Sequence, residues 1–185
     1  VCKKLNVFPV EFVVRGYITG VTDTAAWTAY SKGEREFCGN ILPEGLKKNQ
    51  KFKKPIITPT TKSKEHDEKI SSEEIVKKAL MTQEQYDFVA DKALKLFERG
   101  TEIASKNGLI LVDTKYEFGL KPEGEVVLLD EVHTADSSRY WLKDQYEDSF
   151  EKGLKQKGLD KEYVRSWLRD NGFTGDGVVP DLPED

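Results

Sequence analysis

Residues 109–132 read LILVDTKYEFGLKPEGEVVLLDEV, two runs rich in β-branched and aromatic residues around a turn sequence. The pattern predicts a β-hairpin with strands Leu109–Phe118 and Glu125–Val132. Strict alternation along the first strand separates its residues into two faces. The first face carries Leu109, Leu111, Asp113, Lys115 and Glu117; the second, which we expect to be the core face, carries Ile110, Val112, Thr114, Tyr116 and Phe118.

The length of the hairpin loop decides where Asp130 points. A loop of two or four residues places Asp130 opposite Lys115, beside Asp113 and Glu117, whereas a three-residue loop turns it to the far side. We favour the first arrangement, in which three carboxylates surround one lysine. A divalent cation with oxygen ligands, Mg²⁺ or Ca²⁺, would relieve that imbalance. The alternative is a solvent-facing sheet with ion pairs, and the pattern alone does not separate the two.

Other segments give a coarse outline of the fold. Val7–Ile18 is typical of a strand, and Thr82–Asn107 predicts a long helix that begins with a capping box formed by Thr82 and Gln85. Further elements are expected at Thr24–Tyr30 (a helix), Ser71–Glu74 (a capping box that starts a helix) and Asp160–Asp170 (a helix), with a long ordered loop from Phe37 to Lys69. The expected fold class is therefore α/β (α+β), with a mixed or antiparallel sheet flanked by helices and the Thr82–Asn107 helix on its core face.

Two arginines stand out as candidate anion ligands. Arg15 lies within an otherwise apolar strand, which requires a bound anion or an acidic partner such as Glu11. Arg139 follows Ser137 and Ser138 at a possible helix start, where backbone N–H groups and a forked side chain suit a phosphate. An ordinary N-cap with Arg139 on the surface is the alternative.

Composition excludes several classes of protein. The net charge of −4 argues against a nucleic-acid partner. No apolar run approaches the ~20 residues of a membrane span. Cys2 and Cys38 have no neighbouring Cys or His at ligand spacing, which excludes a zinc site. Seven lysines and no acid occur from Lys47 to Lys64, forming either a solvated basic loop or a collar for a small anion.

Five segments, VEFVVRGYITG, LPEGL, ITPTTKSKEHDEKIS, GLILVDTKYEFG and LLDEVHTADSSRYW, occur in this order in the chain. In that order they resemble the phosphoribosylaminoimidazole-succinocarboxamide synthase (SAICAR synthetase) family, over roughly Leu5–Leu168. The resemblance implies an ATP- and Mg²⁺-dependent ligase with an ATP-grasp-related second lobe. That family joins L-aspartate to a carboxyaminoimidazole ribonucleotide through an acyl phosphate.

The resemblance also implies roles for individual residues. It implies Glu117 and Asp130 as Mg²⁺ ligands, and Arg15 and Arg139, with Ser138 nearby, as a clamp on the ribonucleotide phosphate. The expected contacts to the imidazole, its carboxylate and the ribose are Lys62, Asp67, Asp113 and Lys115, of which Lys62, Asp113 and Lys115 are the catalytic candidates.

Two departures from the family pattern affect these expectations. Val21 stands where the family commonly has a serine whose hydroxyl reaches the substrate phosphate. The family's N-terminal lobe with a glycine-bearing loop over ATP is expected to be absent, so residues 1–170 would form the substrate- and metal-binding lobe and 171–185 an exposed tail. We therefore expect the 185 residues by themselves to be inactive.

Two functions other than the ligase fit the same residues: a non-catalytic nucleotide-binding pseudoenzyme and another Mg²⁺-dependent phosphotransferase. Retention of Lys115, Glu117 and Asp130 favours the ligase. We expect a cytoplasmic location without excluding an organelle, small-molecule partners only, and leave homo-oligomerisation open.

Overall fold

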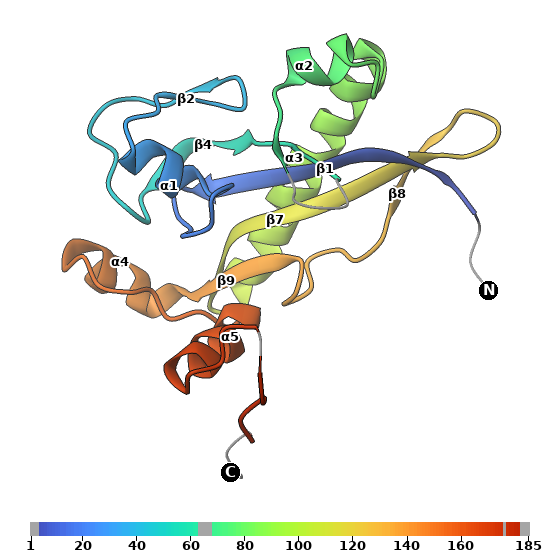
Figure 1. Cartoon of the computed structure of the whole chain (residues 1–185). Helices are drawn as coiled ribbons and strands as arrows, with labels where there is room; N and C mark the ends of the chain where they lie inside the picture. The colour runs from blue at the N-terminus through green and yellow to red at the C-terminus, as the bar shows by residue number, and fades with distance from the viewer. Residues whose placement is uncertain (1–3, 63–67, 176, 182–185) are drawn as a thin grey trace.

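An antiparallel sheet built on two long strands organises the molecule (Figure 1). The computed structural model describes residues 4–62, 68–175 and 177–181. The long strands are β1 (Asn6–Tyr17) and β7 (Leu109–Leu120), which pair with each other along most of their length. The strand order is β6-β5-β1-β7-β8, with β4 also paired to β1 and β9 to β7.

The remaining elements of the described residues are short strands and five helices. The strands are β2 (Glu36–Phe37), β3 (Asn40–Ile41), β4 (Lys51–Ile57), β5 (Thr60–Thr61), β6 (Glu68–Lys69), β8 (Val126–Leu129) and β9 (Ser138–Leu142). The helices are α1 (Ala26–Ser31), α2 (Ser72–Lys77), α3 (Gln83–Lys106), α4 (Lys143–Glu151) and α5 (Lys161–Asp170). None of the described helices is long and apolar enough to cross a membrane.

Local sequence signals place the starts of α2, α3 and α5 correctly. Thr82 and Gln85 form the expected capping box, in which each side chain satisfies a backbone N–H of the other, and α3 follows immediately. Ser71 and Glu74 cap α2 in the same way. Asp160 caps α5 by accepting a hydrogen bond from the backbone of Glu162. These predictions are confirmed because a capping box needs only residues three apart.

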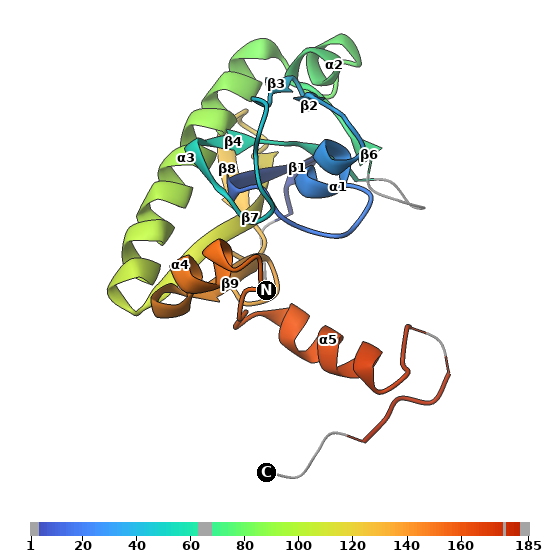
Figure 2. The ribbon, with the colours of Figure 1, turned by 90° about the vertical axis from the view of Figure 1, so that its left-hand side faces the viewer.

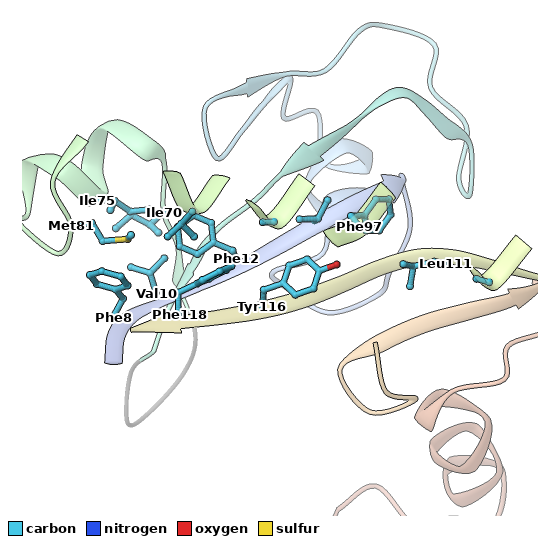
Figure 3. Close-up of a cluster of buried hydrophobic side chains, with 14 residues drawn as sticks. Phe8, Val10, Phe12, Ile70, Ile75, Met81, Phe97, Leu111, Tyr116 and Phe118 are labelled. Atoms are coloured by element: carbon cyan, nitrogen blue, oxygen red, sulfur yellow. The ribbon is translucent and has the colours of Figure 1, made fainter. Parts of the chain in front are cut away.

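Helix α3 covers one face of the sheet, as expected for the core face of the hairpin (Figure 2). Phe12, Tyr116 and Phe118 point toward it and are at most 2% exposed. Phe97 from α3 belongs to the same apolar cluster (Figure 3). Full burial of such side chains contributes ~1.5–3 kcal/mol each. A smaller apolar cluster around α1 lies on the opposite side of the sheet.

The expectation of strict alternation along β7 is wrong. A β-bulge between Leu111 and Asp113 shifts the register with β9, and the extra residue exchanges the two faces of the strand. Leu111 therefore lies in the α3-facing cluster with Tyr116, although strict alternation separates them. Val112 lies on the other side, in a cluster with Trp141 and partly buried Ile110.

Two segments expected to be irregular or helical are strands instead. The expected loop from Phe37 to Lys69 contains β3, β4, β5 and β6, so that expectation is wrong. Residues 138–142 form β9 rather than a helix start, with Arg139 directly opposite Asp113. Strands β4 and β5 pair with β1, and β9 pairs with β7, far away in the sequence in each case, so the short local patterns of these strands carry little signal.

The lysine-rich run lies partly along β4. Lys51, Lys53 and Lys54 are exposed on this strand. Among the described strands, β4 pairs only with β1. These three lysines therefore border an open edge of the sheet.

Candidate functional site

Charged side chains form a row on the sheet face opposite α3, which we call the ionic row. Its position follows from alternation, because the neighbouring residues Val10, Phe12 and Val14 of β1 point into the α3-facing cluster. The row consists of Glu11 and Arg15 from β1, Lys62 just after β5, Asp113, Lys115 and Glu117 from β7, and Arg139 from β9.

Two carboxylates oppose each other at one end of the ionic row. Glu11 and Glu117 are directly paired across β1 and β7, and both are buried. Lys115 Nζ lies 2.9 Å from Glu11 Oε1 and 3.4 Å from Glu117 Oε1, so it bridges the two carboxylates. Lys62 forms an ion pair with the other oxygen of Glu117, Oε2. Burial alone would lower the pKa of Lys115, but its hydrogen bond and ion pairs with the two carboxylates raise it.

Two guanidinium groups share one carboxylate at the other end. Arg139 Nη1 lies 3.1 Å from Asp113 Oδ2, and Arg15 Nη1 lies 3.7 Å from the same oxygen. Arg15 also donates hydrogen bonds to Thr58 Oγ1 at 2.7 Å and to the carbonyl of Thr24 at 3.2 Å. Burial lowers the pKa of Arg15, and the charge of Asp113 opposes that effect.

The expected proximity of Arg15 and Arg139 is confirmed, although the suggested acidic partner of Arg15 is wrong. Its partner is Asp113, whereas Glu11 pairs with Lys115. The two arginines differ in access. The side chain of Arg139 is 26% exposed and that of Arg15 is 9% exposed. Arg139 is therefore the guanidinium that a ligand can reach, while Arg15 stays buried and contacts the same oxygen of Asp113.

The ionic row carries more positive than negative charge. Its four cations are Arg15, Lys62, Lys115 and Arg139, and its three carboxylates are Glu11, Asp113 and Glu117. The excess of one positive charge lies at the arginine end, where two guanidinium groups face one carboxylate. Such a site favours a small anion, and a guanidinium is well suited to phosphate.

Asp130 does not lie opposite Lys115, so that expectation is wrong. The register pairs Glu117 with Leu129 and Leu120 with Val126, and Lys121 N donates to the Glu125 carbonyl. These pairings correspond to the three-residue loop. Asp130 follows the last residue of β8, is exposed, and has a left-handed backbone with φ of 64°.

Ser138 and Asp67 are not brought into the ionic row by the described structure. Ser138 is paired with Thr114, and their hydroxyl oxygens are 2.8 Å apart, on the face opposite to Asp113 and Arg139. Ser138 is also buried, with 5% of its surface exposed. Asp67 lies outside the described residues.

Sequence reasoning missed two contributions to the site. The pairing of Glu11 with Lys115 depends on the β1–β7 register, which the local pattern of neither strand gives. The second is the turn after β1, because a Cβ atom on Gly20 would lie 3.8 Å from Arg139 Nη1. Val21, next in this turn, is 73% exposed and offers no hydroxyl there.

The carboxylate end fits a hard divalent cation. Glu11 and Glu117 present buried oxygen donors side by side, and Mg²⁺ is commonly held by one or two carboxylates with substrate phosphates completing its shell. Among the residues that the structure describes, no group of three or more His, Cys, Asp or Glu side chains is arranged to hold a metal ion. The described residues therefore offer at most two neighbouring carboxylates, Glu11 and Glu117, that could hold a metal ion in the ionic row.

Solved structures identify the class to which this fold belongs. SAICAR synthase from Saccharomyces cerevisiae, complexed with SAICAR, superimposes with a TM-score of 0.80 at 38% identity, over 97% of this chain and 55% of that one. A type-2 SAICAR synthetase in complex with ADP gives a TM-score of 0.66 at 25% identity, over 97% of this chain and 67% of that one. The fold is that of SAICAR synthases.

Sequence comparison gives the family. The family model for SAICAR synthetase matches residues 1–182, and the chain belongs to that family. The chloroplastic phosphoribosylaminoimidazole-succinocarboxamide synthase of Vigna aconitifolia is 52% identical over 187 residues, which cover 100% of this chain and 54% of the relative. The chain thus spans about half the length of that relative.

Proposed function

We propose that the protein carrying this chain is an ATP-dependent ligase of purine biosynthesis. It joins L-aspartate to 5-amino-1-(5-phosphoribosyl)imidazole-4-carboxylate, giving SAICAR, ADP and phosphate by way of an acyl phosphate. Support comes from the name of the Vigna aconitifolia relative and from the SAICAR and ADP complexes of the two solved structures. We place the protein in the cytoplasm, although the plant relative is chloroplastic by name.

The single observation that carries the proposal is the excess of positive charge at the arginine end of the ionic row. Arg139 is the accessible guanidinium, held in place by Asp113, and it binds the ribonucleotide phosphate by forked hydrogen bonds. Arg15 stays buried and contributes charge rather than a second full fork, because all three of its side-chain nitrogens already have partners.

The other end of the ionic row serves the reacting carboxylate. Lys115 and Lys62 place two ammonium groups where negative charge increases during phosphoryl transfer and acyl transfer. Glu117 holds Mg²⁺, which when bound neutralises charge on the transferring phosphoryl oxygens. The family resemblance alone, and not the geometry of the ionic row, supports Asp130 as the second ligand and Asp67 and Ser138 as substrate contacts. In this structure Asp130 is exposed after β8, and Ser138 is bonded to Thr114 on the other face of the sheet.

Binding of SAICAR to the 185-residue chain tests the arginine end directly. Calorimetric titration should give saturable binding that weakens with added salt, because the contact is ionic. Replacing Arg139 with Gln should raise the Kd about 10- to 100-fold, the effect of losing a hydrogen bond to a charged group. The control is Arg165→Gln on α5, which removes an exposed arginine paired with Glu162 and should leave the Kd unchanged.

Two results of these titrations would contradict the proposal. If the wild-type chain shows no SAICAR binding at millimolar concentrations, or if Arg139→Gln and Arg165→Gln bind SAICAR equally well, the ionic row is not the substrate site. The ligation itself is to be assayed in the protein that carries this chain, as ADP release that depends on both L-aspartate and the ribonucleotide.

A further inference from the structure

Helix α3 has a glycine in its interior, at the point where a distant segment packs against it. A glycine inside a helix costs ~1 kcal/mol relative to alanine, so its presence at residue 100 calls for a packing explanation. A Cβ atom built on Gly100 would lie 2.4 Å from Cε1 of His133 and 2.7 Å from Nε2. The imidazole therefore occupies the space that a side chain at residue 100 would fill.

His133 is fixed there by polar contacts as well. Its Nε2 is 2.6 Å from the hydroxyl of Tyr116, a residue with no exposed surface in the α3-facing core. Its carbonyl accepts a hydrogen bond of 2.8 Å from the hydroxyl of Tyr140. The backbone of His133 is left-handed, with φ of 58°, a conformation that a non-glycine residue adopts only at a cost. These contacts therefore offset a local strain.

The segment that His133 anchors leads directly into β9. Ser138 N donates to the Thr134 carbonyl at 3.0 Å, and Ser137 N donates to Thr134 Oγ1 at 3.1 Å, so a tight turn connects the anchor to the strand. Lys115 N then donates to the Ser137 carbonyl at 3.2 Å, which begins the pairing with β7. Only four residues separate His133 from Ser138.

The register of β9 decides which face Arg139 occupies. A one-residue slip would move Arg139 from the side of Asp113 to the side of Thr114, because successive side chains alternate between faces. The β-bulge between Leu111 and Asp113 makes such a slip a local alternative, because the β7–β9 register already changes by one residue at that point.

We propose that His133, seated against Gly100 and bonded to Tyr116, is a positioning residue that fixes the register of β9 and so keeps Arg139 in the ionic row. The identity of the ligand that Arg139 binds rests on the proposed function. The register of β9 does not, because it is a property of the fold. His133 acts from the α3 face of the sheet on a ligand site at the opposite face.

Two variants test the contact between His133 and Gly100, with one of the two residues changed in each. His133→Ala removes the ring, and Gly100→Ala displaces it while favouring the helix, so the second variant remains informative if the first does not fold. His133→Gln is the conservative variant, because its side-chain amide can reach the Tyr116 hydroxyl. Met81→Ala is the matched control, since it removes a buried side chain of the same core outside the β9 region.

The measurements are the NMR cross-strand contacts between Thr114 and Ser138 and the Kd for SAICAR. We expect His133→Ala and Gly100→Ala to lose the contacts and raise the Kd about 10- to 100-fold, the loss of one charge-assisted hydrogen bond. His133→Gln and Met81→Ala should keep both. The inference is overturned if His133→Ala and Gly100→Ala retain the contacts, or if Met81→Ala loses them too.

The two readouts separate this inference from the proposed function. A wild-type chain that keeps the Thr114–Ser138 contacts and binds no SAICAR would refute the substrate assignment. The contacts in His133→Ala and Gly100→Ala would still decide whether His133 sets the register. Weakened SAICAR binding with an intact register in both variants would refute the positioning role.

Discussion

Replacing Lys115 with methionine would leave two buried carboxylates directly opposed across the central strands. Glu11 and Glu117 have only 10% and 6% of their side chains exposed, and Lys115 is the one residue that contacts both among the described ion pairs. Removing one partner of a buried ion pair costs ~3–5 kcal/mol. Since the Lys115 side chain is about a third exposed and Lys62 remains on Glu117, we expect a loss of about 2–3 kcal/mol.

The stability of Lys115→Met should also change with pH, in a direction that follows from the two carboxyl groups. Without Lys115, one of the two opposed carboxyl groups should hold its proton to a higher pH than in the unfolded chain. The folded state then binds more protons than the unfolded state, so the free energy of unfolding should rise as the pH falls from 7 toward 5. In the wild type the pKa of Lys115 is raised above 10.5, so the stability it contributes is fully present below pH 10.5 and is lost as the pH rises through the folded-state value.

Urea denaturation followed by circular dichroism at several pH values would measure both effects. The control is Lys121→Met, which removes a lysine paired with exposed Glu125 in the hairpin loop and should leave the free energy of unfolding close to the wild-type value. If Lys115→Met is as stable as the control at pH 7, or if its stability does not increase on acidification, the carboxylates are not electrostatically coupled through Lys115.

Three further perturbations test other parts of the structure by the same unfolding measurement. Arg15→Met should cost about 2–3 kcal/mol, because it leaves Asp113 with one guanidinium and removes the donor of one buried and one partly buried hydrogen bond; a loss under about 1 kcal/mol would contradict this. Gly119→Ala should destabilise by about 1–3 kcal/mol, since its Cβ would lie 2.8 Å from the carbonyl oxygen of Asn6; unchanged stability would show that β1 can move away. Burial lowers the pKa of His133 below 6.5, so the unfolded state binds more protons and the wild type should lose stability relative to His133→Phe as the pH falls below 6.5; parallel pH profiles would refute it.

The sequence predicted the elements whose signals are local. Capping boxes at Ser71 and Thr82 and the long apolar periodicity of α3 need no information from elsewhere in the chain. The strands β1 and β7 were likewise recognisable from their β-branched and aromatic residues. The sequence left a mixed or an antiparallel sheet open, and every described strand pair is antiparallel.

The errors arise from single-residue changes of register that leave no compositional trace. One bulge residue before Asp113 exchanged the faces of Leu111 and Val112, and one residue more or less in the hairpin loop decided the place of Asp130. The grouping of Asp113, Lys115 and Glu117 survived because it lies entirely beyond the bulge. The contact of Arg15 with Asp113 could not be predicted from the strand that contains Arg15, because β7 supplies the partner.

The exposed lysines of β4 have a consequence for the behaviour of the chain in concentrated solution. A strand with an unpaired edge can add a strand from another molecule and start aggregation, and lysine side chains oppose this because two such edges repel each other. Acetylation or neutral substitution of Lys51, Lys53 and Lys54 would remove that repulsion while leaving the core intact. While charged, the lysines that give the chain its basic stretch protect it against intermolecular β-sheet formation, and self-association should increase as they are neutralised.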